Sequence, residues 1–231
     1  MEKEEVKEVG TEEVKEKKKF FESRTYPFEV RDIDESESPK IIGYAAVYNE
    51  LSEDLGGFRE KIKRGFFTPA IGRDDVRALF NHDDNYVLGR TKSGTLLLED
   101  DKKGLKVEIT PPDTTYARDL LNVMKRGDVD QMSFQFVVKN DSWDNSDMNN
   151  ITRTLIEIDS LWDISAVTFP AYPQTKAGVR SARDVFKGYL EEELQKIEEL
   201  ENVTKEKEMN GKWLERISIM KKRLVLLEKE I

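Results

Sequence analysis

The one histidine in this chain of 231 residues, His82, limits the chemistry that the protein can perform. The chain has no cysteine, which excludes disulfides, thiolate metal sites and a cysteine nucleophile. Paired-histidine zinc motifs and glycine-rich phosphate loops do not occur either, so we expect no metal and no cofactor. Acids are numerous enough for a carboxylate-pair glycosidase, although no spacing suggests one, and the chemistry favoured is a hydroxyl nucleophile with His82 as its general base. A lone histidine at a strand end is more often structural, and that alternative stays open.

Ser133 is the serine that the pattern favours as the nucleophile. It lies in a run of alternating residues in which Met132, Phe134 and Phe136 are apolar. In a strand these three face one way, while Ser133 and Gln135 face the other. The apolar face would anchor the strand and fix the backbone from which the serine projects. The alternative is an ordinary serine on a polar face.

An imidazole base needs an acidic or polar partner that holds its tautomer and stabilises its charged form. The stretch 155–169 supplies three candidates, Glu157, Asp159 and Asp163. If this stretch runs as one unbroken strand, all three acids share a face and large apolar residues occupy the other. Parity therefore does not choose among them, and a solvated acidic face is the alternative to a catalytic one.

A β-rich domain positions these residues. Short apolar runs rich in β-formers alternate with glycines and acidic turn residues. His82 would follow a strand that ends at Phe80, in a polar turn. The expected strands are 28–31, 41–48, 76–80, 95–99, 104–109, 129–138 and 154–169, with 95–109 as a hairpin and the last one bent near Ser160 or split there. A polar loop is expected over 141–150.

Apolar residues recur at helical spacing in two segments of this domain, 58–71 and 116–126. The second helix follows Asp113 or Thr114, and either can cap it through a side-chain oxygen. Gly127 would end it. We therefore expect a few helices at the periphery of a β-domain.

Composition divides the chain into three parts. Residues 1–19 mix Glu and Lys and are expected to form a charged N-terminal tail, followed by a domain at 20–180. In 181–231 apolar residues step by three and four on both sides of residues 210–211, as in two amphipathic helices or one interrupted coiled coil. We favour an intermolecular or extended arm over a helical hairpin packed on its own domain, because the remaining faces are so heavily charged.

Charge and hydropathy exclude several classes of protein. The formal net charge is −9, and the pI is about 5.0, which argues against nucleic-acid binding. There is no apolar run of about 18 residues and no signal peptide at the N-terminus. We expect an intracellular protein that contacts neither nucleic acid nor membrane.

Five segments in this order resemble the tailed-bacteriophage prohead protease family, capsid-maturation serine peptidases with a herpesvirus assemblin-like fold. The similar sequence spans residues 43 to about 175. It comprises residues 43–48, 64–67, 79–83 with 88–90, 126–129 leading to 132–136, and 162–171. The resemblance implies an α+β fold: an assemblin-like β-barrel core with peripheral helices, here followed by a C-terminal amphipathic helical arm.

The same resemblance implies a catalytic set. His82 would be the general base and Ser133 the nucleophile. The assemblin relatives use a second histidine as the third member, and this chain has none, so an acid must serve. The position of the acid in this phage family indicates Asp163, with Asp159 and Glu157 as reserves.

Two features of the resemblance remain open. The family often has glycine where Gln135 stands, and the difference bears on strand packing or substrate approach. The groups of the oxyanion hole are not identified by the sequence, although Arg153 and Arg180 are candidate contributors.

The family implies cleavage of scaffold protein, or of the scaffolding segment of the major capsid protein, and of the protease itself inside the prohead in the host cytoplasm. These capsid components are the expected partners, with a homodimer or self-association through the C-terminal arm. We hypothesise that the arm anchors the protease to them and is removed by self-cleavage.

Two rival readings stand beside the protease. One is a catalytically inactive capsid-assembly or scaffolding protein with the same fold. The other is a non-peptidase acyl hydrolase, against which the absence of a Gly-x-Ser-x-Gly elbow counts.

Overall fold

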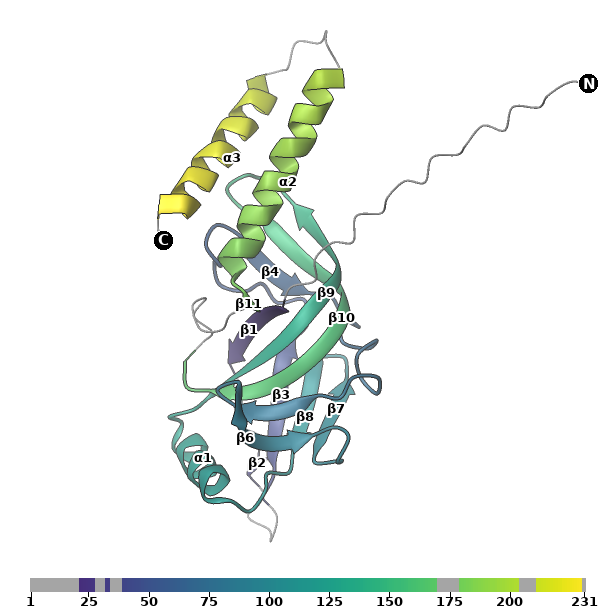
Figure 1. Ribbon diagram of the computed structural model, residues 1–231, viewed down its shortest axis with the longest axis vertical. Coiled ribbons are helices and arrows are strands. Elements are labelled where there is room, and N and C mark those ends of the chain that lie inside the picture. Colours follow the sequence, from purple (N-terminus) through teal and green to yellow (C-terminus); the bar gives the residue numbers. More distant parts are fainter. Residues whose placement is uncertain (1–20, 28–31, 34–38, 170–178, 204–210, 230–231) are drawn as a thin grey trace, which may run out of the picture.

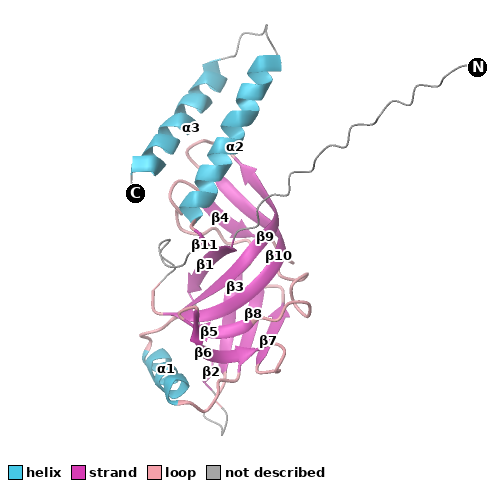
Figure 2. Ribbon diagram, viewed as in Figure 1, coloured by secondary structure: helices cyan, strands magenta, loops and turns pink. Residues whose placement is uncertain are grey.

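The computed structural model describes residues 21–27, 32–33, 39–169, 179–203 and 211–229. The expected tail at 1–19 and the strand expected at 28–31 lie outside these residues. The described part is an α+β protein of two sheets and three helices (Figure 2). None of its helices combines the length and the apolar composition needed to cross a membrane.

The larger sheet has seven strands and carries the residues of interest. Its order is β11-β1-β9-β10-β5-β6, and β4 pairs with β10 in addition. The strands are β1 (Phe21–Pro27), β4 (Arg59–Ile62), β5 (Arg77–Phe80), β6 (Asp83–Arg90), β9 (Gln131–Asp144), β10 (Thr152–Val167) and β11 (Val179–Arg180).

The smaller sheet has four strands in the order β2-β3-β8-β7. These are β2 (Asp32–Ile33), β3 (Ile41–Val47), β7 (Leu96–Asp100) and β8 (Gly104–Ile109), so the predicted hairpin over 95–109 is confirmed. A Cβ at Gly104 would lie 1.9 Å from the carbonyl oxygen of Ala46, so only glycine permits β8 to approach β3 this closely.

The expected barrel is wrong for the described residues, because their strands form two sheets with open edges instead of one closed sheet. A single apolar core joins the sheets, with strands β1 and β9 of one sheet lying against β3 of the other (Figure 1). Aromatic rings fill much of it, including Phe66, Phe67, Phe134 and Phe136, whose side chains are fully buried.

The segment 58–71 is not a helix. Its first half is strand β4, in which Glu60 and Ile62 are buried in alternation, and tight turns occupy the rest. The apolar residues have helical spacing because the turns return Phe66 and Phe67 to the same core that Ile62 reaches from the strand. Parallel pairing of β4 with β10 decided the conformation, and a local pattern does not contain that pairing.

Of the two central strands, β9 is longer than predicted, and β10 has the predicted length but begins and ends two residues earlier. Strand β9 continues to Asp144, so part of the expected loop at 141–150 is strand. Strand β10 is one element, but register shifts against β9 fall between Leu155 and Asp163. A bulge adds a residue to one strand, so alternation along the sequence no longer assigns faces across it.

Helix α1 (Thr115–Arg126) confirms the predicted helix at 116–126. It ends at Gly127, which has a φ of 83° and donates its N–H to the carbonyl of Met124. Thr114 is its N-cap residue, but its side chain makes no capping hydrogen bond.

Helices α2 (Ala182–Val203) and α3 (Gly211–Lys229) pack side by side at one end of the large sheet (Figure 1). They share a second apolar cluster with the domain, in which Phe186 stacks on Phe58 and Tyr189 on Trp143. Arg223 of α3 donates to the backbone carbonyls of Gly57 and Met148. The structure therefore has the helical hairpin packed on its own domain, in place of the extended arm that we favoured.

Candidate active site

A two-residue turn between β5 and β6 presents His82. Phe80 pairs with Asp83, so Asn81 and His82 form the whole connection. Their φ angles are 54° and 55°, and positive φ at both central residues is the mark of a type I′ hairpin turn. The left-handed conformation costs a residue with a Cβ about 1–2 kcal/mol. His82 thus stands where glycine would be the least strained residue.

Asn81 fastens this turn to the end of β10. Its backbone N–H donates to the carbonyl of Ala166 over 2.8 Å. Its side-chain oxygen accepts the backbone N–H of Thr168 at 2.9 Å, and its Nδ2 donates to Thr168 Oγ1 at 3.2 Å. These bonds hold the imidazole beside the strand that carries Asp163.

The carboxylate of Asp163 joins His82 to a serine. Asp163 Oδ1 lies 2.6 Å from Nδ1 of His82 and accepts a hydrogen bond from Ser165 Oγ at 2.7 Å. An ionised carboxylate can only accept, so the proton of this contact is on Nδ1. Nε2 is then the ring nitrogen that can take a proton from a nucleophile. The His82 and Asp163 side chains are only 12% and 10% exposed, which strengthens the contact.

Strand pairing brings Ser133 to the same face of the sheet, although its Oγ makes no hydrogen bond to Nε2 of His82 in this structure. Ser133 lies directly opposite Ser165 on the neighbouring strand, and Gln135 lies opposite Asp163. Directly opposed residues of an antiparallel pair point to the same face, with Cβ atoms about 4.5–5.5 Å apart. The proposed nucleophile and the His82–Asp163 pair therefore share one face of the large sheet.

Ser133 is fully buried and lies in contact with strand β1. Its Oγ lies 2.9 Å from Oγ of Ser23. The sequence analysis identified neither Ser23 nor Ser165. Ser165 could have been found from its spacing, because a residue two positions from Asp163 in a strand faces the same way. Ser23 had no such signal, since its contact depends on the pairing of β1 with β9.

The other two acids contact other groups. Glu157 accepts a hydrogen bond from Lys139 Nζ at 2.7 Å. The backbone carbonyl of Asp159 accepts one from Arg73. Asp163 is the acid that the structure brings to His82.

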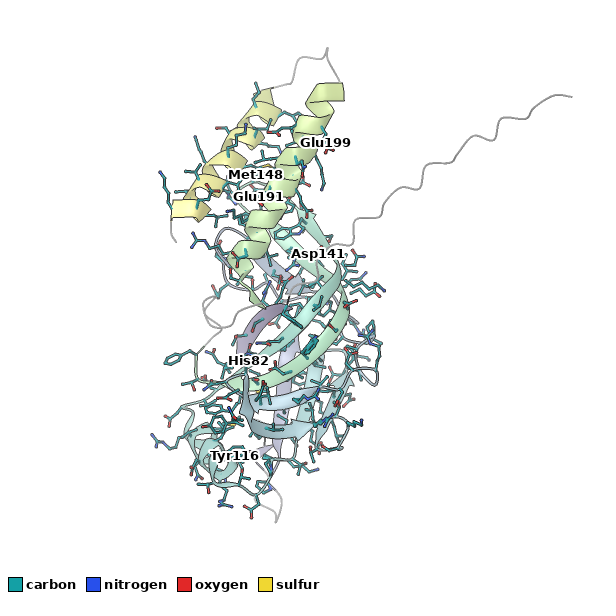
Figure 3. The ribbon with its side chains drawn as sticks, in the orientation of Figure 1. His82, Tyr116, Asp141, Met148, Glu191 and Glu199 are labelled. Atoms are coloured by element: carbon teal, nitrogen blue, oxygen red, sulfur yellow. The ribbon has the colours of Figure 1, made fainter. Side chains whose placement is uncertain are left out.

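Arg153 is committed to a buried ionic cluster. Its guanidinium donates to Glu22, Glu60 and Asp141, and its side chain is 4% exposed. A guanidinium held by three carboxylates is a poor donor to an oxyanion. Asp141 lies well away from His82 along the molecule (Figure 3). The side chain of Arg180 lies outside the described residues.

In the described part of the chain, no three or more His, Asp or Glu side chains lie close enough together to hold a metal ion. The arrangement instead offers a hydroxyl, an imidazole and a carboxylate. This is the set that acyl-transfer enzymes use for nucleophilic attack and proton transfer.

Comparison with family models decides the wider assignment. Residues 26–187 match the model described as caudovirus prohead serine protease. The chain belongs to this family. The match covers most of the chain and confirms the family expected from segments 43–175. No curated protein and no solved structure matches the chain.

Membership in the prohead serine protease family gives the chemistry its class. The family consists of serine proteases of the tailed-phage prohead. The match includes His82, Ser133 and Asp163, but it begins after Ser23 and ends within α2.

Proposed function

We propose that this chain is the capsid-maturation endopeptidase of a tailed phage, with Ser133 as nucleophile, His82 as general base and Asp163 as the group that orients the imidazole. The observation that carries the proposal is the 2.6 Å contact between His82 Nδ1 and Asp163 Oδ1 on the face of the sheet that also holds Ser133. Membership in the prohead serine protease family supports it.

The reaction is acyl transfer. Ser133 Oγ attacks the carbonyl carbon of a peptide bond while its proton passes to Nε2 of His82. Asp163 accepts the Nδ1 proton in a hydrogen bond and stabilises the imidazolium that forms. The imidazolium returns a proton to the leaving amine, the C–N bond breaks, and water then hydrolyses the acyl-serine ester by the same route.

Ser165 supports the carboxylate in this scheme. Its hydroxyl donates to the same oxygen of Asp163 that accepts from His82. With two donors on one oxygen, the carboxylate is restrained from rotating, so Ser165 helps to keep that oxygen directed at the ring.

The substrates we propose are scaffold protein, or the scaffolding segment of the major capsid protein, and the chain itself. Cleavage would take place inside the assembling prohead in the host cytoplasm, where these partners are concentrated. Ser133 has no exposed surface in this structure. A peptide carbonyl can reach it only after the groups that cover this face move, which agrees with activity confined to the assembled shell.

Self-removal of the C-terminal helices remains part of the proposal, but the docking of α2 and α3 changes its expected consequence. Loss of the helices would uncover Phe58, Met148 and Ile151, which are buried in the cluster that the helices share with the domain. Self-cleavage would thus be followed by lower stability or by new contacts at this surface.

Co-expression with the matching capsid and scaffold proteins tests the function. Wild type and Ser133→Ala are compared by the masses of all three proteins in purified proheads. We expect cleavage of capsid or scaffold protein that Ser133→Ala abolishes. Uncleaved proteins in assembled wild-type shells would instead support the inactive assembly protein.

A further inference from the structure

Strand β1 delivers a serine to the proposed nucleophile. Ser23 Oγ lies 2.9 Å from Ser133 Oγ, and either hydroxyl can donate the proton of that contact. Thr25 of β1 pairs with Ser133, and Ser23 pairs with Gln135, so the strand runs along the Ser133 side of the site. The family match begins at residue 26, after Ser23.

The residues on either side of Ser23 are held by buried ion pairs. Alternation along β1 directs Glu22 and Arg24 to the face opposite Ser23. Arg24 donates from Nε and Nη2 to both carboxylate oxygens of Glu60, over 2.7 and 3.0 Å. Glu22 accepts two hydrogen bonds from Arg153, over 2.6 and 2.9 Å.

This ionic cluster comprises Glu22, Arg24, Glu60, Asp141 and Arg153. It joins β1 to β4, β9 and β10, and the side chains of all its members except Asp141 are at most 7% exposed. Such pairs fix a register more than they add stability, because both charges must leave water. Arg24 also donates from Nη1 to the backbone carbonyl of Ser23 over 2.9 Å. The cluster therefore fixes the position of Ser23 on both sides and at its own carbonyl.

We propose that Ser23, held by the ionic cluster, is a positioning residue for the nucleophile: its hydroxyl donates to Ser133 Oγ and thereby directs the Ser133 proton toward His82. A hydroxyl oxygen that accepts one hydrogen bond still donates its own proton elsewhere. Donation from Ser23 occupies a lone pair of Ser133 and leaves its O–H free to turn to the imidazole. This role rests on the proposed function of Ser133.

The first test reads the imidazole and needs no turnover. His82 is the one histidine of the chain, so ¹⁵N-histidine labelling of the full protein yields ring signals that require no assignment. Ser133 Oγ and His82 Nε2 form no hydrogen bond in this structure, so the proposal requires the Ser133 O–H to turn toward the ring in solution, and Ser133→Ala should then shift the Nε2 resonance. Ser23→Ala should shift the same resonance in the same direction, and Ser23→Thr, which keeps a hydroxyl, should leave it near the wild-type value.

Either of two NMR results overturns the proposal. An Nε2 resonance unchanged by Ser133→Ala means that no Ser133 proton is directed at the ring. A response to Ser133→Ala but not to Ser23→Ala means that Ser23 does not control it. Ser181→Ala is the matched control, because it removes another largely buried serine hydroxyl, one that bonds Asp184 at the start of α2.

Kinetics on the proposed substrates give the second test. Loss of one neutral hydrogen bond should lower kcat about tenfold at unchanged KM for Ser23→Ala, while Ser23→Thr and Ser181→Ala should keep the wild-type rate. An unchanged or increased kcat for Ser23→Ala would refute the positioning role even though Ser133→Ala abolishes cleavage. Should wild type and Ser133→Ala prove equally inactive, the peptidase proposal fails, and the ring resonances alone decide on Ser23.

Arg24→Lys tests the link to the ionic cluster. Lysine keeps the charge but cannot reproduce the two-pronged contact with Glu60 or the bond to the Ser23 carbonyl. If the cluster acts through Ser23, Arg24→Lys should lower kcat in the wild-type background and have no further effect in the Ser23→Ala background. Independent, multiplying effects would show that Ser23 does not depend on the cluster.

Discussion

Two polar clusters occupy different parts of the same sheet and use different chemistry. The ionic cluster joins three carboxylates to two guanidiniums, groups that stay charged throughout the neutral range. The candidate site joins Asp163 to an imidazole and to serine hydroxyls, groups that can each give or take a proton. Arg153 and Asp163 belong to the same strand, β10, so one long strand contributes to both clusters.

The difference shows how one sheet can keep the side chains that fix its strand register apart from the side chains that can exchange protons. Burial lowers the pKa of Arg24, but the carboxylates of Glu60 and Glu22 outweigh that effect and leave it above the usual value. Arg24 therefore keeps its charge, and its bonds to Glu60 and Glu22 hold strands in register. In the candidate site the contacts are fewer, and they involve an imidazole and hydroxyls, groups that acyl-transfer enzymes use to move protons.

Among changes that keep both Ser133 and His82, the largest effect on the reaction is expected from Asp163→Asn. An amide can donate to Nδ1 and so stabilises the wrong tautomer of His82, which leaves no lone pair at Nε2 for the serine proton. We expect kcat to fall by about 10³–10⁴-fold with the fold retained. Cleavage kinetics and circular dichroism measure both. Glu157→Gln, on the exposed Lys139 pair, is the control. A fall of less than tenfold would show that Asp163 does not orient the base.

The corresponding change in the ionic cluster is Arg153→Met, and its effect should be on stability. The substitution leaves Glu22 and Glu60 buried with one guanidinium fewer. Breaking a buried ion pair on one side costs about 3–5 kcal/mol. Urea unfolding should show this loss, while the exposed control Arg118→Met should change stability by about 0.5 kcal/mol or less. Equal effects of the two variants would mean that the cluster contributes no more than a surface pair.

A smaller difference between the clusters is expected in acid, where one carboxylate of the ionic cluster, Glu22, should make stability depend on pH. Burial raises the pKa of Glu22, but the guanidiniums of Arg153 and Arg24 outweigh it and hold that pKa below its ordinary value of 4.5. A carboxyl whose folded pKa is lowered stabilises the fold above its unfolded pKa, and this stabilisation is lost as pH falls through the folded pKa.

Glu22→Gln makes this dependence measurable. The difference in unfolding free energy between wild type and Glu22→Gln should be constant from pH 7 down to the ordinary value of 4.5 and should shrink at lower pH. Glu99→Gln, in an exposed pair with Lys106, should show no such trend. A difference that grows as the pH falls would contradict the sign of the shift.

Local sequence patterns predicted the strands whose side chains alternate between buried and exposed. They failed where pairing or packing with a distant segment determined the conformation. Ile41–Val47 and the hairpin of β7 and β8 follow from their apolar runs and turn residues. Segment 58–71 misled the pattern because turns and a short strand placed apolar residues at helical spacing. The helical hairpin at the C-terminus was predicted as helices, but its docking depends on an aromatic cluster with Phe58 and Trp143 that sequence spacing does not contain.

For the candidate site, residue types indicated more than spacing did. Elimination of other chemistry left His82 as the base, the alternating residues around Ser133 favoured it as the nucleophile, and the family resemblance selected Asp163. Parity could not have selected it, because register shifts precede Asp163 in β10. The bond between Ser23 and Ser133 joins residues 110 positions apart. Neither it nor the ionic cluster leaves a local trace, since both arise when β1 pairs with β9.

One local signal of function was present in the turn Asn81-His82. Asn-Gly is the preferred pair for a two-residue type I′ connection. Histidine in place of the glycine adopts a φ of 55° at a conformational cost, and such strain is typical of functional positions. With histidine at this position the protein is less stable than it would be with glycine, a cost that is common at active sites.

Two substitutions of His82 test this conformational cost, and the difference in stability between them should be the smallest effect of the set. His82→Gly and His82→Ala both remove the imidazole and its bond to Asp163, so both should abolish cleavage. They differ only in the Cβ that must adopt positive φ, so His82→Gly should be more stable than His82→Ala by about 1 kcal/mol in urea unfolding. Gly and Ala at Lys92, in an exposed turn without such strain, should show no preference for glycine. If His82→Ala were as stable as His82→Gly, the turn would not be strained, and the histidine would have no conformational cost for function to explain.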